Sequence, residues 1–118
     1  MDTLDVMKLP QDTLKPTGAR LSVIIPAYNE ESGISSILDR VLSIRSELEA
    51  LGVTGPEVVV VNDASRDRTA EIVSRYTDVQ LVSHETNRGY GAALKPGFCH
   101  STGDLVAFLD ADLIYLIL

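Results

Sequence analysis

Residues 57–63 read Glu-Val-Val-Val-Val-Asn-Asp, so that four consecutive valines run directly into two polar side chains. A short β-branched run without polar alternation predicts a strand that is buried on both faces, like the central strands of parallel sheets. The polar turn at residues 62–69 is rich in side chains that are common at helix starts, and a helix to about residue 76 follows. The stretch therefore predicts a strand–helix unit of an α/β fold.

The same unit recurs on both sides of the valine run. Before it, an apolar strand ends at Pro26, which cannot donate to a sheet ladder, and an apolar stripe over residues 34–51 predicts one long helix that Gly52 ends. The remaining elements are expected as a strand at 79–83, a helix that opens at 89–94 and a strand at 105–110. Three strand–helix units and a strand predict an open parallel sheet with helices on both faces, which ends after its fourth strand.

Length and composition limit the class of protein. The 118 residues are enough for one small domain, and the hydrophobic fraction of 45% supports a real core. A formal net charge of −7 argues against a nucleic-acid partner. The single cysteine, Cys99, excludes an internal disulfide, and His84 and His100 lack the spacing of zinc ligands. We interpret these three residues as structural or surface residues.

The beginning of the chain does not resemble a targeting signal. Residues 1–20 have no basic start followed by a hydrophobic stretch and no sustained period, so an N-terminal arm without a signal peptide is predicted. No run of about 18 apolar residues occurs, and no transmembrane segment is predicted. The expected location is cytoplasmic, with the cytosolic face of a membrane as the alternative.

Polar clusters fall where three of the predicted strands end. They are Tyr28–Glu30, Asn62–Asp67, and Asp110 with Asp112. Ligands of open parallel sheets bind outside the carboxyl ends of the strands, where the strand order reverses. If the fourth strand pairs with the first, all three clusters line one crevice.

Asp110 and Asp112 are the candidate metal ligands. Residues i and i+2 of an extended segment point the same way, so both carboxylates can face one ion. Mg²⁺ or Mn²⁺ prefers oxygen ligands and is often completed by substrate phosphates. The alternative is that the two acids only cap the strand end, and the short Asp-x-Asp pattern does not by itself decide between the two.

The other two clusters offer contacts for a nucleoside. Asp63 can accept hydrogen bonds from a nucleobase edge, and Val61, on the same side of the strand, can pack beside the same base. The alternative is that Asp63 only caps the helix that follows. Tyr28 offers a ring for stacking and Glu30 a carboxylate for ribose hydroxyls, unless both belong to an ordinary strand–helix turn.

Two glycines, Gly89 and Gly91, open the third predicted helix. They allow either a phosphate to approach the backbone N–H groups or the helix to pack closely on the sheet. Neither a Gly-x-Gly-x-x-Gly motif nor a P-loop is present, because Leu94 stands where the third glycine would be. We therefore favour the packing role.

Taken in order, these stretches resemble the N-terminal half of a family 2 glycosyltransferase, and within that family the dolichyl- or polyprenyl-phosphate mannosyl- and glucosyltransferases. The stretches that carry the resemblance are Val23–Glu31, Val58–Thr69, Asn87–Leu94 and Gly103–Leu113. The resemblance implies a GT-A fold, a Rossmann-like sheet that holds a nucleoside-diphosphate sugar. GDP- and UDP-linked sugars both remain open, because Asp63 can serve guanine or uracil.

The resemblance also implies roles for individual residues. Pro26, Tyr28 and Glu30 would contact the nucleoside, and Asp63 the base. The segment Asp110, Ala111 and Asp112 would bind ribose, diphosphate and the divalent metal, Mg²⁺ or Mn²⁺. The implied acceptor is a hydroxyl or a lipid phosphate such as polyprenyl or dolichyl phosphate.

The chain departs from the family pattern in three places. Ala64 stands where glycine is frequent, and Pro96 stands inside a predicted helix. Ile114 occupies the position of a metal-binding glutamine, so residues 114–118 are interpreted as an apolar tail left by a truncation or frameshift. The expected organisation is an N-terminal arm (1–20), a donor-binding half (21–113) and this tail.

Two functions from different classes follow. The first is a glycosyltransferase lineage whose donor-binding half is present and whose acceptor half, with any catalytic base, is missing, so that this chain alone is expected to be inactive. The second is a non-catalytic nucleotide-binding or vestigial fragment. A phosphate-receiver module is disfavoured, because the first strand ends in Pro-Ala-Tyr and the third in Ser83-His84 rather than in acidic residues.

Overall fold

The computed structural model describes residues 18–110 and 113–117, and within them strands alternate with helices. In chain order the elements are β1 (Arg20–Ala27), α1 (Ile34–Leu42), α2 (Arg45–Ala50), β2 (Thr54–Asn62), α3 (Thr69–Ser74), β3 (Val79–Ser83), α4 (Tyr90–His100), β4 (Leu105–Asp110) and β5 (Leu113–Ile117). The predicted order of strands and helices is confirmed up to β4.

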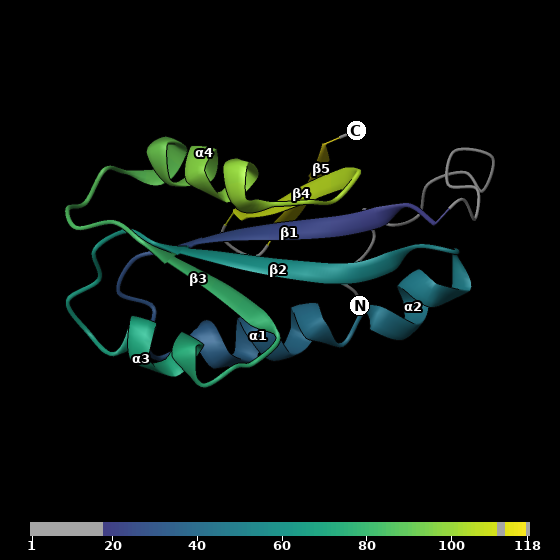
Figure 1. Cartoon of the computed structure of the whole chain (residues 1–118). Helices are drawn as coiled ribbons and strands as arrows, with labels where there is room; N and C mark the ends of the chain where they lie inside the picture. Colours follow the sequence, from purple (N-terminus) through teal and green to yellow (C-terminus); the bar gives the residue numbers. More distant parts are fainter. Residues whose placement is uncertain (1–17, 111–112, 118) are drawn as a thin grey trace.

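The strands form one sheet in the order β3-β2-β1-β4-β5. β1 pairs in parallel with both β2 and β4, and β2 pairs in parallel with β3. The predicted four-stranded parallel sheet is thus confirmed, including the pairing of the fourth strand with the first. The carboxyl ends of β1, β2 and β3 therefore meet at one edge, on the left in Figure 1, and the loops that follow them gather there.

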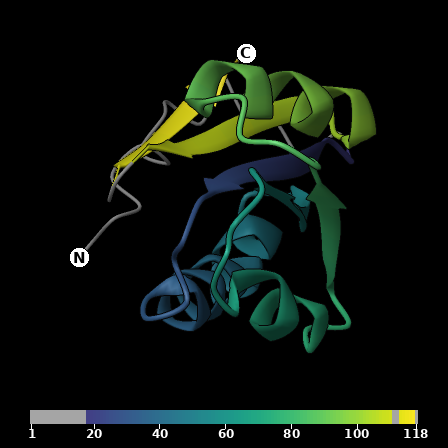
Figure 2. The same ribbon diagram turned by 90° about the vertical axis from the view of Figure 1, so that its left-hand side faces the viewer.

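Helices cover both faces of the sheet, as predicted. Figure 2 shows α4 on one side, and α1 and α3 on the other. The four valines of β2 are at most 1% exposed and alternate between the two sides: Val58 and Val60 join the larger core under α1, α2 and α3, whereas Val59 and Val61 join a smaller core under α4. Burial on both faces explains why this strand lacks polar alternation.

The single helix predicted over residues 34–51 is wrong, because α1 and α2 are separate. The Ser43 hydroxyl donates to the Arg40 carbonyl at 2.7 Å, and the Ile44 N–H donates to the Val41 carbonyl at 3.3 Å. Such i→i−3 bonds compete with the regular helical bonds and end α1 there. The apolar stripe nevertheless continues through the break, since Ile44 is 2% and Leu48 0% exposed.

The sheet extends one strand further than predicted. β5 covers most of the segment interpreted as an apolar tail, and it pairs antiparallel with β4, from Val106 opposite Ile117 to Asp110 opposite Leu113. A run of Leu, Ile and Tyr has high strand propensity, so it can pair with the open edge of β4. The N-terminal arm predicted for residues 1–20 lies largely outside the described residues.

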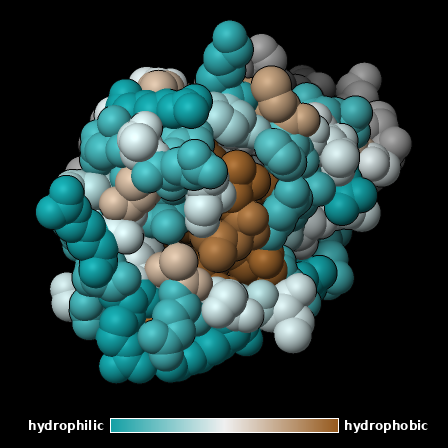
Figure 3. Space-filling view, turned by 60° about the vertical axis from the view of Figure 1, so that its left-hand side comes forward, coloured by the Kyte–Doolittle hydropathy of each residue, from teal (hydrophilic) through white to brown (hydrophobic). Residues whose placement is uncertain are grey.

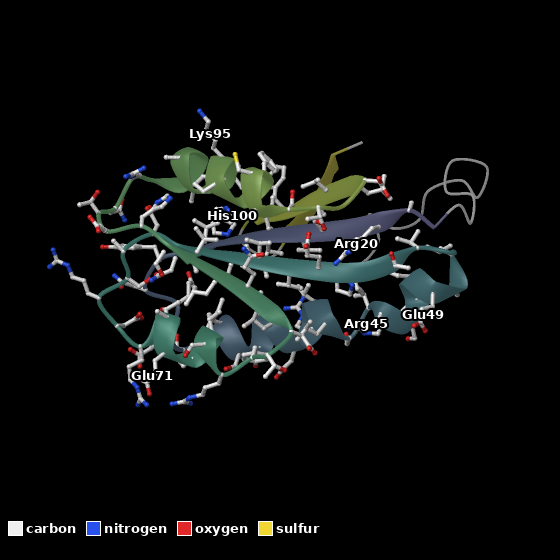
Figure 4. All side chains as sticks on the ribbon, viewed as in Figure 1. Arg20, Arg45, Glu49, Glu71, Lys95 and His100 are labelled. Atoms are coloured by element: carbon white, nitrogen blue, oxygen red, sulfur yellow. The ribbon has the colours of Figure 1, made fainter. Side chains whose placement is uncertain are left out.

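At the amino ends of the strands, opposite the loop edge, the Glu57 carboxylate accepts hydrogen bonds from two neighbouring segments. Its Oε1 accepts the Ser22 hydroxyl at 2.6 Å and the Thr102 N–H at 2.7 Å, and its Oε2 accepts the Thr102 hydroxyl at 3.0 Å. Burial alone would raise the pKa of Glu57, but these hydrogen bonds lower it below its ordinary value. Arg20 belongs to the same end of the sheet (Figure 4).

Candidate functional site

The loops after β1 and β2 are joined by reciprocal hydrogen bonds. The backbone N–H of Asn29 donates to the Ser65 hydroxyl at 2.9 Å, and Asn29 Oδ1 accepts the Arg66 N–H at 2.8 Å. Asn29 adopts a φ of 53°, a left-handed conformation that asparagine tolerates better than most residues. The Asn29 side chain and backbone therefore bridge the two loops.

The same junction continues toward α3. The Glu30 N–H donates to Thr69 Oγ1 at 2.8 Å, and the Glu31 N–H donates to Asp67 Oδ2 at 3.1 Å. Asp67 Oδ1 in turn accepts the Thr69 N–H at 3.0 Å. Both side chains that accept from the first loop are therefore fixed at the start of α3. The two loops thus form a single wall at the carboxyl edge of the sheet.

Asp63 occupies the centre of this edge. Its side chain is 5% exposed, and its Oδ1 accepts hydrogen bonds from His84 Nδ1 at 3.0 Å and from the Arg88 N–H at 2.8 Å. Its Oδ2 accepts the Gly89 N–H at 2.8 Å. Burial alone would raise the pKa of Asp63, but these donors lower it below its ordinary value. Asp63 therefore carries its charge while it joins β2 to the loop between β3 and α4.

A cavity of about 500 Å³ opens between the loops that Asp63 connects. Its lining residues are Tyr28, Asn62, Ala64, Ser65, Arg66, His84, Glu85, Thr86 and Asn87. Tyr28 is 45% exposed, so one face of its ring is available to a ligand. Figure 3 turns this end of the molecule toward the viewer and shows a hydrophobic patch framed by hydrophilic side chains. A cavity with an aromatic ring and several amides suits a planar polar ligand.

Arg66 is the arginine among the residues that line this cavity, whereas two arginines further along the chain are engaged elsewhere. Arg68 and Arg75 both pair with Glu71, at 3.1 and 2.8 Å. Glu71 lies on the outer side of α3 and points away from the sheet (Figure 4). Arg66 is therefore the arginine among the described lining residues that can meet an anionic group.

The structure distributes the predicted nucleoside residues over different environments. Tyr28 lines the cavity, and Asp63 lies directly behind it, between the lining residues Asn62 and Ala64. Pro26 is within β1, and the Glu30 side chain is exposed outside the cavity lining. Val61 is 0% exposed in the core under α4, so its side chain does not reach the cavity in this structure, and a contact with a base stays a prediction. The regular pleat carries Val61 into the core instead of the loop edge.

The candidate metal ligands lie at the edge of what the structure describes. β4 ends at Asp110, two residues beyond Phe108, which pairs with Ile24 of β1, so the strand delivers this acid to the same edge as Pro26. The Asp110 side chain, Ala111 and Asp112 are outside the described residues. Elsewhere in the described chain, no three His, Cys, Asp or Glu side chains come together as a metal site. Two closely spaced carboxylates are chemically suited to Mg²⁺ or Mn²⁺.

The two glycines at the start of α4 do not have the packing role that the sequence favoured. A Cβ added at Gly89 or Gly91 would meet no described atom within 4 Å. Gly89 instead has a φ of 88° and gives its N–H to Asp63, as does Arg88, so neither N–H is free for a phosphate. The packing glycine is Gly97, where a Cβ would collide with the Ile24 side chain.

His84 is a site residue that sequence reasoning did not single out. Its side chain is 7% exposed, it lines the cavity, and it contacts Asp63. Its position directly after β3, at the same sheet edge as Asp63, is the signal that could have identified it. The structural role assigned to His84 is consistent with this burial, but its partner could not be read from spacing along the chain.

Comparison with known proteins gives a family match over most of the chain. A family model described as "Glycosyl transferase family 2" matches residues 22–117. A dolichyl-phosphate beta-glucosyltransferase of Trichomonas vaginalis is 39% identical over 111 residues, which are 89% of this chain and 34% of that protein. An undecaprenyl-phosphate 4-deoxy-4-formamido-L-arabinose transferase of Salmonella paratyphi B is 37% identical over 80% of this chain and 29% of its own length. The chain thus spans about a third of the curated relatives it matches.

Solved structures match the fold over a similar portion. A mannosyltransferase from Pyrobaculum calidifontis, in complex with GDP-Man and Mn²⁺, gives a TM-score of 0.68 at 34% identity, over 93% of this chain and 33% of that one. A glucosyl-3-phosphoglycerate synthase from Mycobacterium tuberculosis, in complex with Mn²⁺, UDP and phosphoglyceric acid, gives 0.62 at 31% identity, over 86% and 37%. No helix among residues 18–110 and 113–117 is long and apolar enough to cross a membrane.

Proposed function

Since the chain belongs to glycosyl transferase family 2, we propose that it forms the donor-binding half of a glycosyltransferase that uses a nucleoside-diphosphate sugar. The main support is the cavity of about 500 Å³ between the loops that follow β1, β2 and β3. It lies where ligands of open α/β sheets bind, and it is bordered by groups that suit a nucleoside: an aromatic ring, amides and a charged carboxylate behind them.

Residues in and around the cavity have separate roles in this proposal. The Tyr28 ring stacks on the base, and Asp63 accepts a base N–H through the acceptor capacity that its internal bonds leave free. Glu30 and Pro26 border the ribose from the β1 side. Arg66, which already gives its backbone N–H to Asn29, presents its guanidinium to the anionic part of the donor.

Asp110 and Asp112 would hold the divalent metal, Mg²⁺ or Mn²⁺, with Ala111 between them bordering the ribose and diphosphate. When bound, such an ion neutralises the charge that develops on the departing nucleoside diphosphate. Support comes from the position of Asp110 at the carboxyl end of β4, beside β1, and from the Mn²⁺ in the two matching solved structures.

The acceptor in this proposal is a lipid phosphate of the polyprenyl or dolichyl type, or another hydroxyl or phosphate acceptor. The names of the curated relatives support a lipid phosphate, and a reaction at the cytosolic face of a membrane would suit it. Because the chain spans about a third of the length of these relatives, we expect the chain alone to bind the donor without turnover. The alternative is a non-catalytic nucleotide-binding or vestigial fragment.

Calorimetry tests the donor site. Titration of the 118-residue chain with UDP- and GDP-sugars in the presence of Mn²⁺ should give saturable binding that weakens when EDTA removes the metal. Tyr28→Ala should weaken binding, by about tenfold if base stacking is worth about 1–3 kcal/mol. The matched control is Tyr76→Phe, because Tyr76 donates to Asp39 on the far side of the sheet, 2.9 Å away. No binding of either sugar nucleotide would contradict the proposal, and turnover of a polyprenyl phosphate would exclude the non-catalytic alternative.

A further inference from the structure

The hydrogen bonds inside the protein use most of the capacity of the Asp63 carboxylate. A carboxylate has four acceptor positions, two on each oxygen. Oδ1 accepts two donors, His84 Nδ1 and the Arg88 N–H, and Oδ2 accepts one, the Gly89 N–H. Counting only donors from the part of the chain that the structure describes, Oδ1 is saturated and one acceptor position remains, on Oδ2.

We propose that His84 is a positioning residue that restricts Asp63 to one ligand N–H and thereby selects uracil over guanine in the donor. This inference rests on the proposed donor site. The two backbone donors belong to the fold of the loop, so His84 is the side chain that decides whether Oδ1 has room for a ligand. Its ring is 7% exposed and held at 3.0 Å from Oδ1, which leaves no space for a competing donor at that position.

The two bases differ in the number of N–H groups that they present side by side. Guanine offers N1–H and the N2 amino group next to one another, and a carboxylate binds this pair with both of its oxygens. Uracil offers one N–H, at N3, with a carbonyl oxygen on each side. A carboxylate with one free position satisfies uracil completely, whereas it leaves one guanine donor buried without an acceptor, which is unfavourable.

The cavity also offers donors for the two uracil carbonyls. Asn62, the last residue of β2, and Asn87, in the loop between β3 and α4, both line it. The side-chain amide of Asn62 donates to the Ser83 hydroxyl at 3.4 Å, and that of Asn87 donates to the Asp63 carbonyl, also at 3.4 Å. Both bonds are long, so a ligand carbonyl can replace them at little loss. The donor–acceptor–donor order of these groups complements the acceptor–donor–acceptor edge of uracil.

Binding of UDP and GDP to the unmodified chain, each with Mn²⁺, tests the selectivity. We expect UDP to bind roughly tenfold or more tightly than GDP, because guanine leaves a buried donor unpaired. UDP methylated at N3 should lose most of the UDP affinity, since it lacks the N–H that Asp63 accepts. Equal binding of UDP and GDP, or tighter binding of GDP, would overturn the inference without affecting the donor site itself.

A matched pair of variants tests the part played by His84. In His84→Asn the side-chain amide takes the place of the Nδ1–H and can still donate to Asp63, whereas His84→Leu has a similar shape and no donor. We expect H84N to keep the preference for UDP and H84L to reduce the ratio of the two affinities at least severalfold. His100→Leu is the control, because His100 is exposed at the end of α4 (Figure 4) and contacts the Pro96 carbonyl instead.

The UDP and GDP affinities distinguish a failure of the selectivity role of His84 from a failure of the donor site. A purely structural His84 would weaken UDP and GDP equally in H84L, which would overturn the selectivity role. If H84L does not fold, His84→Ala, which also lacks the donor, takes its place, and an unchanged ratio of the UDP and GDP affinities in H84A would overturn the selectivity role. Failure of the unmodified chain to bind either nucleotide would overturn the donor site, and the inference with it.

Discussion

Ala64 is the residue at which the local backbone and the side chain conflict. It follows Asp63 in the turn out of β2 and adopts a φ of 64°, in the left-handed region. A Cβ is unfavourable there by about 1–2 kcal/mol, which is why glycine is the usual residue in such a conformation. Ala64 also lines the cavity, so its methyl group faces the space proposed for the donor.

Ala64→Gly should therefore stabilise the fold. We expect the free energy of unfolding to rise by roughly 0.5–1 kcal/mol, because the relief of the left-handed strain exceeds the extra entropy of glycine in the unfolded chain. Urea denaturation at equilibrium measures the change.

The control is Asn29→Gly at the second left-handed position, where φ is 53°. That substitution also removes the Oδ1 that accepts the Arg66 N–H, so it should not stabilise. An unchanged or lower stability of A64G would contradict the strain at Ala64.

For single residues, the sequence predicts which side chains reach the edge of the sheet but not which partners they contact there. Tyr28 and Asp63 are found at the edge because each follows a buried strand, a relation that is local in the chain. The bond between Asp63 and His84 joins positions 21 residues apart, and it depends on the pairing of β2 with β3. No spacing rule within one element can reveal such a contact.

α4 is the element whose position depends on the absence of a side chain. At Gly97 the helix backbone lies so close to β1 that a Cβ would collide with Ile24 and would reach Val61 Cγ2 at 3.3 Å. Glycine inside a helix is otherwise unfavourable, so its presence here indicates a requirement for close packing. The small core under α4 depends on this approach.

Gly97→Ala should destabilise the protein by roughly 1–3 kcal/mol, because the added methyl group forces α4 away from β1. The shift in the thermal midpoint, followed by circular dichroism, measures the effect.

Gly91→Ala is the matched control in the same helix. No described atom lies within 4 Å of the Cβ that it adds, so it should be neutral or stabilise by up to about 1 kcal/mol. Equal effects of the two substitutions would show that helix propensity, rather than packing, dominates at Gly97.

Periodicity predicts the elements better than it predicts their continuity. The apolar stripe over residues 34–51 is real, but the Ser43 hydroxyl interrupts the helix without interrupting the stripe, so the pattern could not show the break. The strand order, in contrast, follows from general rules of α/β topology and is confirmed by the pairing of β1 with β4. β5 was missed because the last residues resemble a strand only if a partner edge is available.

Two hydrogen-bonded carboxylates, the buried Asp63 and the partly buried Glu57, connect segments at opposite ends of the sheet. Asp63 joins the loops at the carboxyl edge of the sheet, and Glu57 joins β1, β2 and the segment before β4 at the amino edge. In each case burial opposes the charge, but the hydrogen bonds outweigh it and lower the pKa. A group whose pKa is lower in the folded state stabilises the fold when it is ionised.

The fold should accordingly lose stability in acid. The contribution of both groups is complete above their pKa in the unfolded chain and is lost as the pH falls through their lower folded values, so the free energy of unfolding should decrease below about pH 5. Urea denaturation at a series of pH values measures this slope.

Asp63→Asn and Glu57→Gln should each lower stability at neutral pH by roughly 1–3 kcal/mol and flatten the acid slope. Glu49→Gln, an exposed substitution on α2 (Figure 4), should leave the slope unchanged. A slope that persists in both D63N and E57Q would assign the acid sensitivity to other carboxyl groups.

The central place of β1 has a consequence for the order in which the chain folds. β1 begins at residue 20, and its partner β2 is complete by residue 62, but its other partner, β4, begins only at residue 105. During synthesis the edge of β1 that pairs with β4 therefore stays unpaired while more than half of the chain is made. Pairings of such high sequence separation form slowly. The open side of β1 is thus the surface most exposed to wrong partners while the protein is being made.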